Sequence, residues 1–119
     1  MDENAAIVTR LGKPFVIEEF GLPRDGQAID AVTATKLRDE YYRTILSYIG
    51  PIASGANFWA FGGTARPIKG QLFWKSGDDP MGDPPMEEQG LNSVFTSDAS
   101  TWSVIRNAAS NIRRPVVTF

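Results

Sequence analysis

Two short apolar segments place the tightest limits on the fold of this chain. The first is the apolar run of residues 15–17, within a strand predicted over 14–19, and the second is residues 56–61, where Asn57 is the one polar position. A run that is apolar on both faces is typical of a buried parallel strand. A helix is predicted between them over residues 34–49, and alternating strands and helices imply a parallel α/β sheet with right-handed crossovers. Two strands cannot form a self-sufficient parallel sheet, because both faces and both edges need cover. The 119 residues are therefore expected to be a fragment of a larger α/β fold.

The remaining elements are less sharply defined. Residues 2–11 resemble the end of a helix that Gly12 terminates. The helix over 34–49 begins at Thr33 or Thr35 and stops at Gly50. Its predicted buried stripe consists of Leu37, Tyr41, Ile45, Tyr48 and Ile49.

A stretch rich in Gly, Pro and Asp follows over residues 62–97 and has no helical period. A segment of that length is usually a functional loop or disordered. A last helix is predicted from Asp98 or Ser100 to the stop at residues 113–115, before a short apolar tail. Its expected apolar stripe is Trp102, Ile105, Ala109 and Ile112.

The composition excludes several chemistries. The chain has no Cys and no His, so disulfides, Cys/His zinc sites and Ser-His-Asp triads cannot form within it. Its net charge of −2 gives no electrostatic reason to expect nucleic acid or an anionic membrane as a partner. No apolar run approaches the roughly 18 residues of a membrane span, and the acidic start predicts no export signal. Catalysis here would depend on carboxylates, Lys or Tyr.

Glu18 and Glu19 end the first predicted strand, immediately before Phe20 and Gly21. A carboxylate at the carboxyl end of a buried parallel strand is where barrel enzymes place catalytic groups. Acids at such a position also form ion pairs or cap loops. Strict alternation of side chains would put the two acids on opposite faces, so that only one could point into a site. The residues alone leave the choice open.

Three tryptophans are candidates for binding or packing. Trp59, near the end of the second predicted strand, could present its flat face to a sugar ring or belong to the core. Trp74 lies in the long loop, where it is expected to line a cleft. Trp102 lies on the stripe of the last helix, so packing is the better interpretation.

The acidic loop over residues 77–88 is a weak candidate for calcium. Asp78, Asp79 and Asp83 supply hard oxygens, but their spacing and the place of Gly82 do not fit an EF-hand. A solvated loop is the default, and no metal is predicted.

Residues 12–21, 57–63 and 82–95 together resemble the C-terminal part of a glycoside hydrolase family 5 enzyme, and within that family the endo-β-1,4-mannanases. The resemblance implies a (β/α)8 barrel of which the chain supplies the end of helix 6, strand 7, helix 7, strand 8, a long loop and helix 8. It makes Glu19 the catalytic nucleophile, Glu18 its inactive neighbour and Trp59 the aromatic platform. Residues of the loop over 62–97, and Trp74 above all, would shape the neighbouring sugar-binding subsites. No cofactor is implied.

Three departures from the family bear on activity. The family's acid/base glutamate lies in an Asn-Glu pair, and no such pair occurs here; the family's histidine is also missing. A barrel needs roughly 250 residues. We therefore expect residues 1–119 to be a partial catalytic domain without strands 1–6, inactive alone. Its expected partners are a β-mannan or related β-glycan, further copies of itself, or the missing barrel half.

The resemblance implies a secreted or periplasmic parent protein. A non-catalytic carbohydrate-binding piece and an unrelated small α/β interaction domain are the alternatives.

Overall fold

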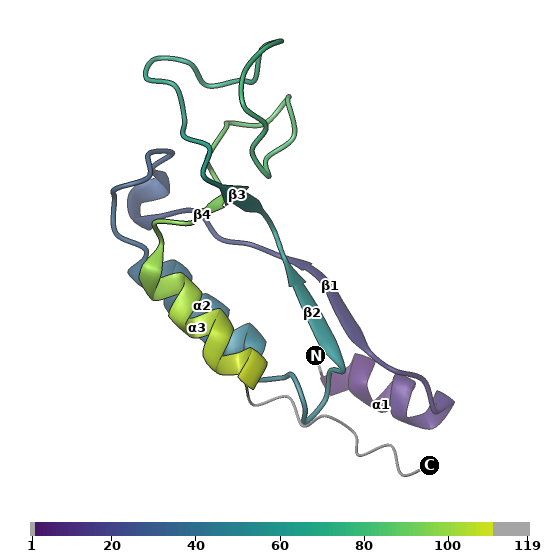
Figure 1. The fold of residues 1–119 in the computed structure, drawn as a ribbon. Helices are drawn as coiled ribbons and strands as arrows, with labels where there is room; N and C mark the ends of the chain where they lie inside the picture. The colour runs from purple at the N-terminus through teal and green to yellow at the C-terminus, as the bar shows by residue number, and fades with distance from the viewer. Residues whose placement is uncertain (1, 111–119) are drawn as a thin grey trace, which may run out of the picture.

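A computed structural model describes residues 2–110 as a parallel strand pair covered on one side by two helices (Figure 1). The predicted order of helix, strand, helix, strand, long loop and helix is confirmed, and two short strands are added to it. The predicted end of the last helix, with Ile112 and residues 113–119, lies outside the described residues. The elements are α1 (Asp2–Leu11), β1 (Val16–Phe20), the short 3₁₀ turn η1 (Asp25–Gln27), α2 (Lys36–Leu46), β2 (Gly55–Phe58), β3 (Phe61–Gly63), β4 (Val94–Phe95) and α3 (Ala99–Ser110).

Strands β1 and β2 are parallel neighbours, as expected, and α2 connects them. The pairing starts at Val16 opposite Gly55 and Ile17 opposite Ala56. Both strands run toward the long loop, so their carboxyl ends meet at one edge (Figure 1). The second strand is shorter than predicted because pairing with β1 stops at Phe58.

The core lies between the strand pair and the helices. Phe20 and Tyr42 are buried there with Val94 and Val104, and Ile17 packs against this cluster. The ring of Phe20 meets that of Tyr42 edge-on, at 4.9 Å between centroids. No described element covers the opposite face of the strands, where the side chain of Val16 is 44% exposed.

Helix α2 differs from its prediction in length and in its buried face. It ends at Leu46, and Tyr48 and Ile49 then close tight turns through i→i−3 bonds. The buried residues are Arg38, Asp39 and Tyr42. Of the predicted stripe, Tyr41 and Ile45 pack against the core, whereas Leu37 is 57% exposed. Hydrogen bonds to distant segments, described below, make burial of the charged residues possible.

The start of α2 is capped from outside the helix. The Asp25 carboxylate accepts hydrogen bonds from the N–H groups of Lys36 (3.2 Å) and Leu37 (2.9 Å). Thr35 occupies the N-cap position, as predicted, but its hydroxyl bonds Asp39 and Ser100 instead of the helix backbone. The 3₁₀ turn thus supplies the cap.

Helix α3 packs against α2 (Figure 1) with a face displaced by one position from the prediction. Thr101 and Val104 are buried, Trp102 and Ile105 are half-buried, and Ala109 is exposed. Trp102 packs on the core as expected: its ring lies edge-on to Phe58. Its indole N–H donates to the Phe95 carbonyl at 2.8 Å.

The long segment is bounded by a second parallel pair that the sequence did not predict. Strand β3 follows β2 after two residues and pairs with β4, with Phe61 opposite Val94. The close fit depends on Gly62, because a Cβ there would lie 2.7 Å from the Phe95 ring. Residues 64–93, which connect β3 to β4, therefore begin and end next to each other, and hydrogen bonds within the segment hold it together. We call this segment the excursion.

The molecule is open rather than compact. Its radius of gyration is 16.6 Å, against about 13 Å for a compact domain of this length. Helix α1 lies beyond the amino end of β1, apart from α2 and α3 (Figure 1), and Ile7 and Leu11 on it are exposed. Across residues 2–110, no helix combines the length and the apolar character that crossing a bilayer requires.

Candidate functional site

The carboxyl ends of β1 and β2 bring the segments of Glu19 and Trp59 together. Phe20 pairs with Phe58, and the N–H of Trp59 donates to the Phe20 carbonyl at 2.7 Å. Gly21 is required at this edge, because a Cβ there would collide with the carbonyl oxygen of Trp59. Two residues are predicted for a sugar-cleaving site. One of them, Trp59, thus donates a hydrogen bond to the residue that follows the other, Glu19.

A β-bulge overturns the expectation of strict alternation in β1. From Ile17 to Phe20 the chain advances three residues, while β2 advances only two, from Ala56 to Phe58. One residue of β1 is therefore extra, and Glu18 and Glu19 share the position opposite Asn57. Alternation alone would separate Ile17 and Phe20 onto opposite faces, yet both pack on the helix side.

Glu18 and Glu19 are both exposed at the surface of the chain. Among residues 2–110, neither carboxylate forms a salt bridge or a side-chain hydrogen bond. Within these described residues, the structure therefore does not support the alternative that the two acids form local ion pairs or cap a loop. Asn57, opposite them on β2, is exposed as well.

Trp59 is held mainly through its backbone. Its carbonyl accepts a hydrogen bond from the Tyr42 hydroxyl of α2 at 3.2 Å, and its peptide bond to Ala60 is cis. The next residue, Ala60, is bonded to the segment that enters β4: its N–H donates to the Asn92 carbonyl, and its carbonyl accepts from the N–H of Val94. The side chain of Trp59 is half-buried, so part of the ring remains accessible.

Trp74 belongs to the excursion over residues 64–93, which extends past the carboxyl ends of β1 and β2 (Figure 1). Its indole N–H donates to the Asp78 carbonyl at 3.1 Å, and the ring lines a small hollow of 70 Å³ with Phe73 and Met81. The described contacts of Trp74 are within its own loop. Its role as a subsite residue stays a prediction.

The acidic loop uses its carboxylates internally. Buried Asp83 accepts hydrogen bonds from the N–H groups of Gly90 (3.0 Å) and Asn92 (2.9 Å) and from the Ser93 hydroxyl. The Asp78 carboxylate likewise accepts from Lys75 N–H within the loop. Within residues 2–110, no group of three or more metal-ligating side chains could hold an ion. Two of the three carboxylates that suggested calcium, Asp78 and Asp83, thus accept hydrogen bonds from their own loop and its continuation into β4.

A buried ionic cluster that the sequence did not predict joins the segment after β1 to the segments that flank β4. The Asp98 carboxylate pairs with both Arg24 and Arg38, and all three side chains are at most 2% exposed. Arg38 also donates to the carbonyls of Leu22 (2.7 Å) and Ser93 (3.1 Å). Because the partners lie up to 74 residues apart, no local sequence signal reveals the cluster.

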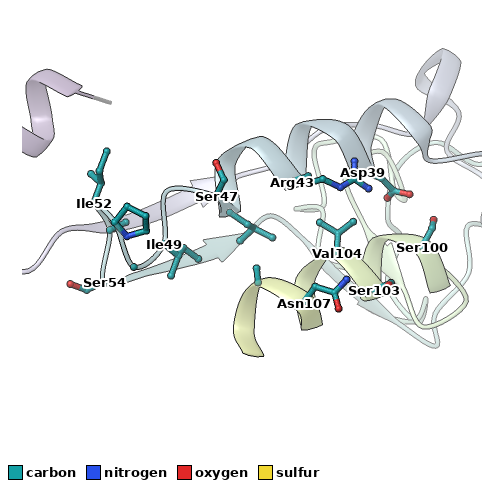
Figure 2. A pocket seen from close by; sticks show the side chains of 15 residues that line it. Asp39, Arg43, Ser47, Ile49, Ile52, Ser54, Ser100, Ser103, Val104 and Asn107 are labelled. Atoms are coloured by element: carbon teal, nitrogen blue, oxygen red, sulfur yellow. The ribbon is translucent and has the colours of Figure 1, made fainter. Parts of the chain in front are cut away.

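A hollow of 1310 Å³ lies between α2, α3 and the turn that leads into the amino end of β2 (Figure 2). Figure 2 shows Arg43, Ser47, Ile49 and Val104 around it. The strand ends that carry Glu19 and Trp59 do not line it. Its position argues against a role in the chemistry of those residues.

A family model described as GH family 5 beta-mannosidase-like matches residues 1–116. No curated protein sequence matches the chain.

Structures of a glycoside hydrolase family 5 mannosidase from Rhizomucor miehei share the fold at 30% sequence identity. One glutamate-to-alanine mutant matches with a TM-score of 0.74 over 93% of this chain, and the enzyme without a named mutation matches with 0.70 over 93%. A second glutamate-to-alanine mutant, described in complex with mannosyl-fructose, matches with 0.71 over 91%.

The chain spans 29% of the length of these structures. The family model nevertheless covers nearly all of the chain, and the structural match extends over 93% of it at 30% identity. The chain therefore belongs to the β-mannosidase-like members of glycoside hydrolase family 5.

Proposed function

We propose that residues 1–119 are the C-terminal part of a catalytic (β/α)8 barrel, with β1 and β2 as its seventh and eighth strands. In this assignment α1 is the end of helix 6, and α2 and α3 are helices 7 and 8. The family match and the parallel pair with helices on one face support it. Strands 1–6 would come from outside this chain and would cover the open face of β1 and β2.

The reaction that we propose is retaining hydrolysis of a β-mannosidic bond. In the assembled site, the Glu19 carboxylate attacks the anomeric carbon and forms a glycosyl ester. A second carboxyl group, about 5–5.5 Å away on a strand outside this chain, donates its proton to the leaving oxygen. The same group then takes a proton from water, which attacks the ester and restores the Glu19 carboxylate.

One observation carries this proposal: the end of β1, with Glu19, is joined to Trp59 by an interstrand hydrogen bond at the edge where barrel enzymes place their sites. Trp59 would stack against the sugar that is cleaved. The excursion over 64–93, with Trp74, would shape neighbouring subsites beyond the same edge.

The proposed substrate is β-1,4-mannan or a related β-1,4-linked oligosaccharide containing mannose. The family model and the mannosyl-fructose bound by a relative both favour a mannose-containing ligand. Exposed Leu72 and Phe73 add apolar surface to the excursion, which suits an oligosaccharide longer than one sugar.

A mechanism-based inactivator tests the assignment directly. A 2-deoxy-2-fluoro-β-mannosyl fluoride should trap the glycosyl ester in the complete enzyme that carries this segment, because fluorine slows the hydrolysis of the ester. Peptide mapping is expected to find the label on Glu19. A label on Glu18, or on no residue of 14–21, would contradict the proposal.

A further inference from the structure

One side chain of α2, that of Tyr42, contacts both chain segments that carry the candidate site residues. The ring of Tyr42 lies edge-on to Phe20, the residue after Glu19, with 4.9 Å between centroids. Its hydroxyl donates to the carbonyl of Trp59 at 3.2 Å. The side chain is fully buried, so neither contact competes with bulk water.

We propose that Tyr42 is a positioning residue that fixes Trp59 relative to Glu19. Its place in catalysis rests on the function proposed above, but its structural effect can be measured without any substrate. Tyr42 touches no reacting group and would act only through Phe20 and the Trp59 carbonyl.

The surroundings of Trp59 explain why such a residue is needed. The β2 pairing ends at Phe58, and the chain then turns toward β3 within two residues. At this point Gly21 brings the β1 backbone against the Trp59 carbonyl from one side, while the Tyr42 hydroxyl holds it from the helix layer. These two contacts fix the position of the Trp59 carbonyl, and so of the backbone from which the Trp59 side chain projects.

The hydroxyl is suited to a permanent structural bond. A tyrosine hydroxyl is already protonated in the physiological range, and burial raises the pKa of Tyr42 further, so the group can donate throughout that range. The charged groups near it are Arg38 on its own helix, Asp83 from the excursion and Asp98 before α3. Arg38 acts against the rise in pKa and the two carboxylates add to it.

Hydrogen exchange on the 119-residue chain provides the test. Tyr42→Phe keeps the ring and removes the bond, so the backbone N–H of Trp59 should exchange on the order of fivefold faster, as expected for one lost buried hydrogen bond. The N–H of Trp102 donates to the carbonyl of Asp98, the residue before α3, at 2.9 Å. It reports opening at the start of α3, away from the Tyr42 hydroxyl, and should change less. Tyr41→Phe is the matched control, because Tyr41 lies on the same helix and is half-buried.

Equal acceleration at Trp59 and Trp102, or no change at Trp59, would overturn the inference. Steady-state kinetics of the complete enzyme provide a second measurement. There, Tyr42→Phe should raise KM and lower kcat severalfold without changing the pH profile, while Tyr41→Phe leaves both constants unchanged. If Tyr42→Phe leaves both constants unchanged while Glu19→Gln is inactive, the positioning role fails and the proposed function stands.

Discussion

At the scale of single residues, the bulge in β1 changes how the two strand-end acids are interpreted. It places Glu18 and Glu19 together opposite Asn57, so geometry in this chain does not exclude either from the site. The choice of Glu19 rests on its family position immediately before the aromatic-glycine pair. Because the backbone geometry does not distinguish the roles of Glu18 and Glu19, substitution of each carboxylate is needed to do so.

Glu19→Gln in the complete enzyme should abolish turnover, because an amide cannot form the glycosyl ester. Glu18→Gln, the matched control, should keep substantial activity. The measurement is the initial rate of hydrolysis of an aryl β-mannoside and of mannan. Equal losses in the two variants would show that both acids act, and inactivity of Glu18→Gln alone would reverse the assignment.

Asp98 carries the largest stability effect that we expect from one polar substitution. Asp98→Asn removes the charge that neutralises two buried guanidinium groups, Arg24 and Arg38, and should cost about 3–5 kcal/mol of unfolding free energy. Urea denaturation followed by circular dichroism measures the loss. Asp79→Asn, in the exposed part of the loop, should stay within about 0.5 kcal/mol. Similar midpoints for the two variants would contradict a structural role for the cluster.

At the scale of elements, local patterns predict the parallel pair β1–β2 and the helix between them, because apolar runs and helix stops are local signals. The bulge cannot be seen in β1 alone, since it depends on the register with β2. Strands β3 and β4 are equally hidden, because they are very short and join residues about 30 positions apart. The charged buried face of α2 depends on Asp98 and Thr101, which lie some 60 residues away.

Gly62 tests the β3–β4 junction. Gly62→Ala would place a Cβ 2.7 Å from the ring of Phe95 and 2.9 Å from the Ser93 side chain, so overpacking should destabilise the fold by about 1–3 kcal/mol. Gly55→Ala, on β2, has no atom within 4 Å of the new methyl group and should be close to neutral. Urea midpoints of the two variants give the comparison. Equal midpoints would mean that the junction contributes little to the fold.

At the scale of the whole molecule, we propose that the chain holds only one part of the catalytic site. Glu19 and Trp59 lie on the chain, but the acid/base carboxyl required for the first bond cleavage is proposed to lie outside it. General acid catalysis typically contributes about 10²–10⁴-fold. The 119-residue chain alone should therefore release no reducing sugar from mannan above buffer. Release that disappears on Glu19→Gln would show that the chain has a proton donor of its own.

The open face of the strand pair leads to the last prediction, which concerns self-association. Val16 is 44% exposed on that face, Phe61 of the neighbouring β3 is 60% exposed, and the radius of gyration exceeds that of a compact domain. Uncovered apolar surface favours association by roughly 25 cal/mol per Å² buried, and unpaired strand edges add a template for pairing.

We expect sedimentation at micromolar concentration to show oligomers of the 13.1 kDa chain. Val16→Lys should weaken association about tenfold, since a charge on the strand opposes pairing. Val32→Lys introduces the same charge at a side chain that is 90% exposed in a loop, so it should leave association unchanged. A compact monomer with a sharp melting transition would contradict this prediction. It would favour an independent small α/β domain, because uncovered apolar strand faces and edges promote association.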